Sequence, residues 1–249
     1  MGARRSFKTD SPLHVAALRG WIDLSASSQS GGEWTQFLDV KNNNPGAINA
    51  ARRPAVAAAN NGLPVASFVT NDAVAVPLVA GINNQTDRLG WAFWVKVGNL
   101  AGFNTLLSIS SGTGAASAAK IQLFLNGSNA ITVDAYISGA NGRRFTSTAT
   151  VAEDSWTWLR LRYDSSLGGD ANVATFINGA AATGTYSNLG SGGTLTTLPT
   201  TTGNLIIGNI NDGSASAALT GSIGPDIFFL GEDPSVADEL RLMNYRVPT

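Results

Sequence analysis

The chain contains no cysteine and a single histidine, His14, among its 249 residues. Without cysteine it can form no disulfide bond, zinc–thiolate site or iron–sulfur cluster. One histidine leaves no histidine-based metal site, and a Ser-His-Asp triad could be built only on His14. These classes of site are excluded before any pattern in the sequence is considered.

Charge is also scarce, since Lys, Arg, Asp and Glu make up 13% of the residues and the net charge is −1. A nucleic-acid groove needs a concentration of basic residues that this composition does not supply. No apolar run approaches the roughly 18–20 residues that cross a bilayer. We therefore expect neither a nucleic acid nor a membrane as partner.

Residues 1–20 carry four basic residues and one acidic residue before any strand pattern begins. The stretch RRSFK at residues 4–8 resembles part of a twin-arginine export signal. The apolar stretch that should follow it is interrupted by charged and polar residues, so we expect no signal peptide. The segment is instead predicted to be an N-terminal arm, either frayed or docked on a partner through Arg4, Arg5 and Lys8.

After the arm the sequence is dominated by short runs rich in β-branched and aromatic residues, separated by Gly, Asn, Asp or Ser. This spacing predicts the strands of a β-sandwich. The segment 234–245 is the one that predicts a helix, with Ser235 as its cap, and its neighbouring acids Asp233 and Glu239 are expected to be solvated. A long loop is expected over 190–204. The expected strands are 91–97, 103–109, 121–127, 130–138, 143–151, 156–163, 173–179, 204–210 and 222–231.

Alternation within these strands separates a core face from an outward face. In 156–163 the set containing Leu159 and Leu161 is the better core, because burying the unpaired Arg160 and Arg162 of the other set would cost several kcal/mol. The same division in the other strands predicts a shared core. Its expected members are Trp91, Phe93, Leu123, Leu125, Leu159, Leu161, Tyr163 and Ile207.

The outward positions carry an unusual number of aromatic rings among their charges. Three interpretations are open: loops cover the rings as a second small core, another subunit contacts them, or a sugar ring stacks on them. As a ligand-binding or interface surface, the candidate residues are Trp94, Phe124, Trp156, Trp158, Arg160 and Arg162.

The chain resembles the concanavalin A-like (laminin-G-like) jelly-roll superfamily across residues 21–249. In that family's order it carries the phrases IDLSASS, GLPVASFVTND, WAFWVK, DSWTWLRLRYD, VATFING, LIIGNI and LTGSIGPDIFFL. The resemblance implies an all-β, two-sheet antiparallel jelly-roll sandwich with a short C-terminal helix, forming one domain after the arm of residues 1–20. The arm, the segment NNNPGAINAARRP and the Thr-rich loop depart from the family pattern.

Catalysis is not expected. Glycosidases of this superfamily carry a pattern that resembles Glu-x-Asp-x-x-Glu on one strand. This pattern places the catalytic carboxyl groups on one face, and a retaining mechanism needs them about 5 Å apart. None of the four glutamates of this chain opens that pattern. A lyase would need a Tyr or His base near Arg and Gln, and the spacing of Tyr136, Arg143 and Arg144 does not demand such a site.

No cofactor is expected apart from a calcium ion, which some laminin-G-like domains carry at the rim of the sandwich. Calcium prefers oxygen ligands from several loops. Asp72, Asn209 and Asp212 are the candidate ligands, although Asx residues beside Gly are turn formers by default.

The absence of cysteine, the low charge and the basic arm are typical of a building block rather than of a secreted lectin. The composition, rich in Ala, Thr, Gly and Ser, resembles that of tailed-bacteriophage virion proteins. We expect a non-catalytic structural or adhesive virion-surface protein, such as a head decoration or tail-fibre module assembled in the host cytoplasm. Its expected partners are other virion proteins, further copies of the chain or a host surface glycan. The alternatives are a carbohydrate-active enzyme, either a glycoside hydrolase or a polysaccharide lyase, and a free carbohydrate-binding module.

Overall fold

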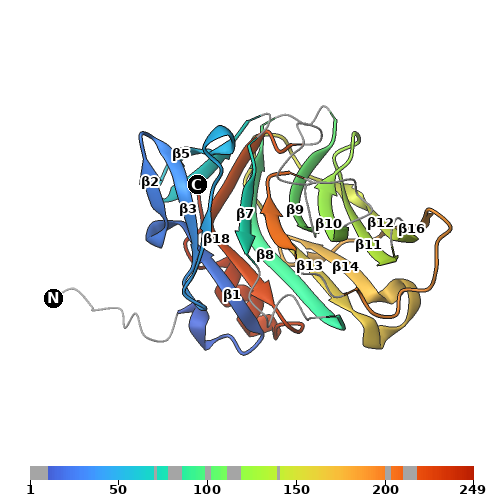
Figure 1. Cartoon of the computed structure of the whole chain (residues 1–249). Coiled ribbons are helices and arrows are strands. Elements are labelled where there is room, and N and C mark those ends of the chain that lie inside the picture. The colour runs from blue at the N-terminus through green and yellow to red at the C-terminus, as the bar shows by residue number, and fades with distance from the viewer. Residues whose placement is uncertain are drawn as a thin grey trace.

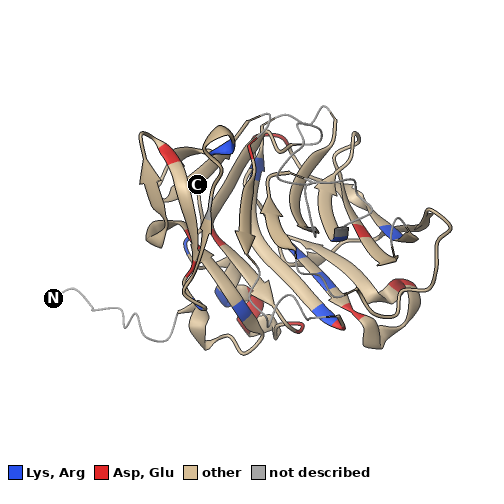
Figure 2. Cartoon of the chain, viewed as in Figure 1, with Lys and Arg blue, Asp and Glu red and all other residues tan. Residues whose placement is uncertain are grey.

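The protein is described by a computed structural model that covers residues 11–69, 72–77, 86–98, 102–110, 119–138, 141–199, 203–209 and 218–249. Within these residues the strands build two antiparallel sheets that lie face to face (Figure 1). Charged residues are spread sparsely over both sheets (Figure 2). The predicted all-β, two-sheet class is confirmed.

The larger sheet has the order β1-β3-β5-β6-β18-β8-β13-β14-β15, with β2 and β4 paired to β3. Strands from both ends of the chain therefore lie in one sheet. Its strands are β1 (Leu18–Asp23), β2 (Ser28–Ser30), β3 (Glu33–Asp39), β4 (Asn44–Ala47), β5 (Ala55–Ala58), β6 (Pro64–Phe68), β8 (Arg88–Val97), β13 (Thr157–Asp164), β14 (Val173–Ile177), β15 (Ala180–Ala181) and β18 (Gly221–Leu230).

The smaller sheet has the order β16-β12-β11-β10-β9-β17-β7. Strands β9 to β12 are consecutive antiparallel neighbours, which matches the closely spaced strand runs in the sequence. The strands are β7 (Val74–Pro77), β9 (Asn104–Ser110), β10 (Ala119–Leu125), β11 (Ala130–Ser138), β12 (Asn141–Thr150), β16 (Gly184–Leu189) and β17 (Asn204–Ile207).

Helical segments are short. The predicted C-terminal helix is α2 (Val236–Met243), and the Ser235 hydroxyl caps it by accepting a hydrogen bond from the Asp238 backbone N–H at 3.1 Å. The other helical segments among the described residues are single 3₁₀ turns: η1 (Pro12–His14), η2 (Leu24–Ala26), η3 (Ala50–Arg52), η5 (Ser165–Leu167) and η6 (Gly169–Asn172).

The main core lies between the two sheets and is made by the inward position of each strand. Leu161 of β13 and Trp91 of β8 are opposite one another in the larger sheet, and both are 0% exposed. Leu123 of β10 is opposite Val133 of β11 in the smaller sheet. All eight core residues predicted from alternation are buried in this one cluster.

The structure moves the start of the sandwich into the segment predicted as the arm. Strand β1 begins at Leu18, and Leu18 is opposite Leu230 of β18. Val15 and Ala17 are 2% and 3% exposed, and the Gly231 backbone N–H donates to the Ala17 carbonyl at 2.8 Å. Residues 11–20 are therefore bound to the sheet, because their apolar side chains find a surface formed by the other end of the chain.

Candidate functional site

The outer face of the larger sheet buries the aromatic residues that the sequence assigned to an exposed surface. Trp158 on β13 is 0% exposed. It packs with Val15, Phe228 and Leu242 in a second hydrophobic cluster, separate from the main core. Of the three interpretations, the second small core is the one that the structure shows for Trp158. Helix α2 and the segment before β1 cover the ring, and neither contact is visible in the local alternation of β13.

Arg160 is buried in the same layer, and two acidic side chains compensate its charge. Its guanidinium is 4% exposed and forms ion pairs with Asp233 and, at 3.0 Å from Nε, with Glu239. The ring of Phe176 lies 3.4 Å from its Cζ atom. The expectation of a solvated cap is therefore wrong for Glu239, which is 12% exposed, because a buried guanidinium needs nearby carboxylates. It holds for Asp233, which is 42% exposed although it also pairs with Arg160.

Two other candidates on this sheet, Trp94 and Arg162, also contact α2 or its flanking residues. Trp94 is half-buried, and its Nε1–H donates to the Met243 carbonyl at 3.2 Å. Arg162 donates from Nη1 to Asp233 Oδ2 at 3.1 Å. Trp156 is half-buried and lies directly before β13. The Trp94 and Arg162 side chains hold the C-terminal segment on the sheet.

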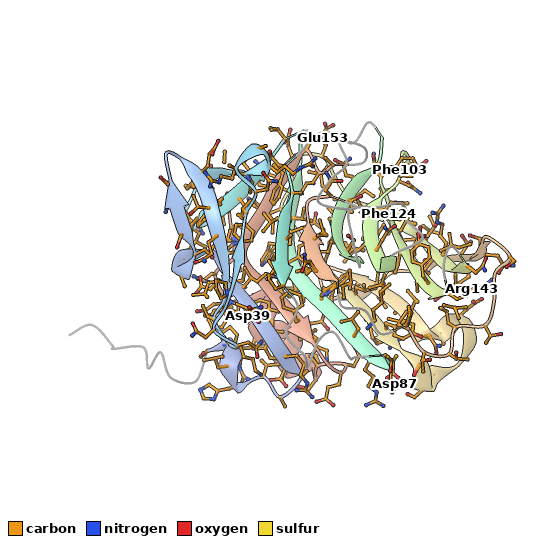
Figure 3. The ribbon with its side chains drawn as sticks, viewed as in Figure 1. Asp39, Asp87, Phe103, Phe124, Arg143 and Glu153 are labelled. Atoms are coloured by element: carbon orange, nitrogen blue, oxygen red, sulfur yellow. The ribbon has the colours of Figure 1, made fainter. Side chains whose placement is uncertain are left out.

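Phe124 lies on the other sheet, where the arrangement is different. It occupies an outward position of β10 and is 7% exposed, with Phe103 at a centroid distance of 5.9 Å (Figure 3). Phe103 precedes β9 and is 56% exposed. The Cζ atom of Arg144 lies 5.5 Å from the centroid of the Phe124 ring. The exposed Phe103 ring thus packs against the Phe124 ring, which in turn contacts the Arg144 guanidinium.

A row of polar side chains crosses this outer face beside the rings. Gln122 of β10, Asp134 of β11 and Arg144 of β12 are opposite one another in the strand register. Arg144 donates two hydrogen bonds to Asp134, from Nε to Oδ1 at 2.6 Å and from Nη2 to Oδ2 at 2.7 Å. This bidentate geometry fixes both planar groups, and the hydrogen bonds raise the pKa of Arg144.

Tyr136 and Gln122 extend the row into a network. The Tyr136 hydroxyl lies 3.3 Å from Gln122 Oε1 and 3.4 Å from Asp134 Oδ2. Burial and the neighbouring Asp134 carboxylate raise the pKa of Tyr136 well above its ordinary value. Gln122 Nε2 is buried and has no hydrogen-bond partner. The network therefore holds one donor that is not satisfied, a feature that buried amides rarely keep.

Lys120 lies two residues before Gln122 on the same strand. It is 1% exposed, and burial lowers the pKa of its ammonium group to about 8. Desolvation disfavours the charged form of an amine, which explains the direction of the shift.

We call this surface the Phe103 face, and it can recognise a ligand by two kinds of contact. The Phe103 ring offers an apolar plane, and the Arg144 side chain, which is 38% exposed, offers a guanidinium that Asp134 fixes. Asp134, Gln122 and Tyr136 are themselves only 2–4% exposed. Its members are Phe103, Phe124, Gln122, Asp134, Tyr136 and Arg144.

Of the residues on the Phe103 face, the sequence had selected only Phe124 as a site residue and Tyr136 and Arg144 as unlinked residues of a hypothetical lyase. The pairing of Asp134 with Arg144 depends on the register of the β11–β12 hairpin, which the sequence does not give. One signal was available, since polar Thr132, Asp134 and Tyr136 alternate with the core residues of β11.

Two of the three proposed calcium ligands, Asp72 and Asn209, lie among the described residues. Asp72 is 8% exposed and accepts a hydrogen bond from the Val69 backbone N–H at 2.8 Å, and Asn209 is buried. Asp212 lies outside the described residues, as do Arg4, Arg5 and Lys8 of the arm. Among the described residues no three His, Cys, Asp or Glu side chains form a group that could hold a metal ion. The calcium site stays a prediction.

The two sheets and their order define a lectin-type β-sandwich. Residues 68–224 match the family model of the concanavalin A-like lectin/glucanases superfamily. This match spans more than half of the chain, and the chain belongs to that superfamily. Comparison with curated protein sequences finds no match. In the part of the chain that the structure describes, no helix has the length and apolar character needed to cross a membrane.

Solved structures show the same fold at low sequence identity. Trypanosoma rangeli sialidase in complex with sialic acid is 15% identical with a TM-score of 0.57, over 91% of this chain and 32% of the sialidase chain. The binding domain of botulinum neurotoxin serotype G is 13% identical with a TM-score of 0.53, over 90% of this chain and 50% of that one. The chain thus spans about a third of the length of the sialidase, and the likeness concerns the fold alone.

Proposed function

We propose that this chain is a non-catalytic glycan-binding domain and that the glycan lies on the Phe103 face. The observation that carries the proposal is the 56% exposed ring of Phe103, supported by Phe124 beside the fixed Asp134–Arg144 pair. An exposed ring can stack on the apolar C–H face of a pyranose, while the Arg144 guanidinium donates hydrogen bonds to its hydroxyls. Membership of a lectin/glucanase superfamily is consistent with this use of the face.

The chemistry of the polar row favours binding over catalysis. Hydrolysis by the usual glycosidase mechanisms needs two carboxyl groups on the same site, about 5 Å or 6.5–9.5 Å apart. Asp134 is the one Asp or Glu within the described strands of the smaller sheet, and Arg144 occupies both of its oxygens. A tyrosine base would need a lowered pKa, whereas the pKa of Tyr136 is raised.

Binding is tested by titrating the full chain with the best ligand from a glycan array, using calorimetry. We expect Phe103→Ala to weaken binding about tenfold or more, which corresponds to about 1.4 kcal/mol, while leaving the unfolding temperature unchanged. Leu167→Ala is the matched control, because Leu167 is also exposed, at 48%, but lies in η5, the turn that follows β13 of the larger sheet. Equal affinity of the Phe103→Ala variant and the wild type, or no ligand on the array, would contradict the proposal.

The alternative is a polysaccharide lyase, which is favoured by the assembly of Tyr136, Gln122 and Arg144 around one point of the sheet. We expect no turnover when the chain is incubated with a panel of neutral and acidic polysaccharides. The measurement is absorbance of the unsaturated product together with release of reducing ends. Turnover that disappears in a Tyr136→Phe variant would establish the enzyme and overturn the non-catalytic assignment.

We further propose that the domain is carried on the surface of a bacteriophage particle, as a decoration or tail-fibre module. Low charge, the absence of cysteine and the basic residues at positions 4, 5 and 8 support this role, because such an arm can dock on a neighbouring subunit. Mass spectrometry of purified particles should find the protein, and capsid or tail genes should adjoin its gene. Its recovery only from the soluble fraction, beside metabolic genes, would contradict this role.

A further inference from the structure

A polar cleft of ≈ 450 Å³ opens at the edge of the sandwich, on the opposite side of β12 from the Phe103 face. Arg143 lies on the inward side of β12, because it is opposite Ala135, whereas the next residue, Arg144, points outward. Figure 3 labels Arg143 at the end of the smaller sheet that β12 and β16 form. The cleft is therefore separate from the polar row described above.

Arg143 forms hydrogen bonds with two side chains that line this cleft, one from β16 and one from the turn η6. It donates to Asp170 Oδ1 from Nε at 2.8 Å and from Nη2 at 2.5 Å, and Asp170 belongs to η6, between β13 and β14. From Nη1 it donates to Oδ1 of Asn188, its direct neighbour across the β12–β16 pair. One guanidinium thus fixes a carboxylate and an amide before any ligand arrives.

These hydrogen bonds leave one acceptor atom and one donor atom of the cleft without a partner. Within the part of the chain that the structure describes, Asp170 Oδ2 accepts no hydrogen bond and Asn188 Nδ2 donates none. Because only the oxygen of an amide can accept from Arg143, the amide nitrogen of Asn188 must face away from the guanidinium. Asp170 is 44% exposed, so its free oxygen is open to a ligand.

A glycine-rich backbone keeps one wall of the cleft free of side chains. Gly192 has a φ of 75°, and a Cβ atom there would lie 2.5 Å from Cγ of Asn188. A Cβ atom on Gly193, whose φ is 137°, would lie 2.9 Å from Ile137 Cδ1. The Ser191 backbone N–H donates to the side chain of Asn141 at 2.9 Å, which ties this loop to β12. A side chain at position 192 would displace Asn188.

We propose that this cleft is a second saccharide subsite, which binds two adjacent hydroxyls of a neutral sugar ring. One hydroxyl donates to Asp170 Oδ2 and its neighbour accepts from Asn188 Nδ2, which a vicinal diol can do with a single ring. The charges of Arg143 and Asp170 cancel, so the cleft favours neither an anion nor a cation. The lining contains no aromatic ring, and binding is therefore weak and dependent on hydroxyl geometry. This site is independent of ligand binding at the Phe103 face.

The test is an NMR titration of the ¹⁵N-labelled full chain with the methyl glycosides of mannose, galactose and glucose at millimolar concentrations. We expect saturable shifts at the amides of Gly169, Asp170, Asn188 and Gly193 for at least one of the three. Absence of saturable shifts at these amides for all three sugars would overturn the subsite.

Three variants distinguish binding at this cleft from binding at the Phe103 face. Asn188→Ala should weaken the binding at least fivefold, because it removes the amide donor from an exposed position of an edge strand. Phe103→Ala should leave these shifts unchanged, so failure of the Phe103 face and failure of this cleft give different results. Asp87→Asn is the matched control, since Asp87 lines a different cleft, of ≈ 570 Å³. Unchanged affinity in Asn188→Ala, or loss of affinity in Asp87→Asn, would also overturn the subsite.

Discussion

At the scale of single residues, Arg160 has the clearest energetic role. Removing it would leave Glu239, which is 12% exposed, without its cationic partner. We expect Arg160→Ala to lower the free energy of unfolding by about 3 kcal/mol, as measured by urea denaturation, because breaking a buried pair strands a charge. Asp233→Asn is the comparison: Asp233 is 42% exposed, and we expect it to cost less than about 1 kcal/mol. Similar losses in both variants would contradict this account.

Lys120 predicts how stability changes at alkaline pH. Its pKa is about 8 in the folded chain, below the value of 10.5 for an unperturbed lysine. Between these two values the unfolded chain binds more protons than the folded chain, so stability should rise with pH from about 8 toward 10. Thermal unfolding of the wild type and of Lys120→Met should be compared across this window. In Lys120→Met, stability should rise less steeply with pH than in the wild type, because the titrating amine is gone. Parallel curves of stability against pH for the two proteins would contradict a lowered pKa of Lys120.

Alternation along a strand predicted which residues face the core, but not what covers the residues on the opposite side. Leu159 and Leu161 were assigned correctly, since their burial follows from the pattern of β13 alone. Trp158 and Arg160 were not, because their cover is α2, which lies more than 70 residues away in sequence, as the Arg160–Asp233 separation of 73 shows. The polar row could not be predicted for a similar reason, because Gln122, Asp134 and Arg144 come together only through the register of β10, β11 and β12.

At the scale of elements, α2 has one buried face and one exposed face. Leu242 is 0% exposed in the second hydrophobic cluster, whereas Leu240 is 47% exposed. We expect Leu242→Ala to cost about 2–5 kcal/mol of unfolding free energy, because it removes apolar contacts and leaves a cavity. Leu240→Ala should change stability by no more than about 0.5 kcal/mol. Denaturant unfolding of the pair checks this, and a reversed order would show that the helix packs differently.

The longer strands were predicted from the sequence, and short strands such as β5 were not. The runs 91–97, 121–127 and 130–138 correspond to β8, β10 and β11, whose β-branched and aromatic residues give a clear signal. The expected strands begin at residue 91, yet the structure also contains β5, which is made of Ala and Val. Strand β5 exists because it pairs with β6, an interaction that local propensity does not report.

At the scale of the whole molecule, the ends of the chain meet in the same sheet. Strand β18 lies between β6 and β8 and also pairs with β1. The larger sheet is therefore incomplete until this C-terminal strand is present. Residues 68–224, the segment that matches the superfamily model, lack β1 to β5, all of β6 except Phe68, and β18 after Gly224. We expect this segment alone to remain unfolded by circular dichroism, and the full chain to unfold in one calorimetric transition. Two separable transitions would contradict a single domain.

Truncation from the N-terminus tests where that single unit begins. Residues 11–17 contribute Val15 and Ala17 to the second hydrophobic cluster, and β1 starts at Leu18. Removing residues 1–10 should leave the unfolding temperature unchanged and, if the arm docks on a partner, abolish assembly. Removing residues 1–20 should unfold the chain or lower its stability severely, because it also deletes half of β1 and uncovers Trp21 and Phe228. Differential scanning calorimetry and size-exclusion chromatography measure both effects. A stable chain after the longer truncation would place the boundary at residue 21, where the sequence pattern had put it.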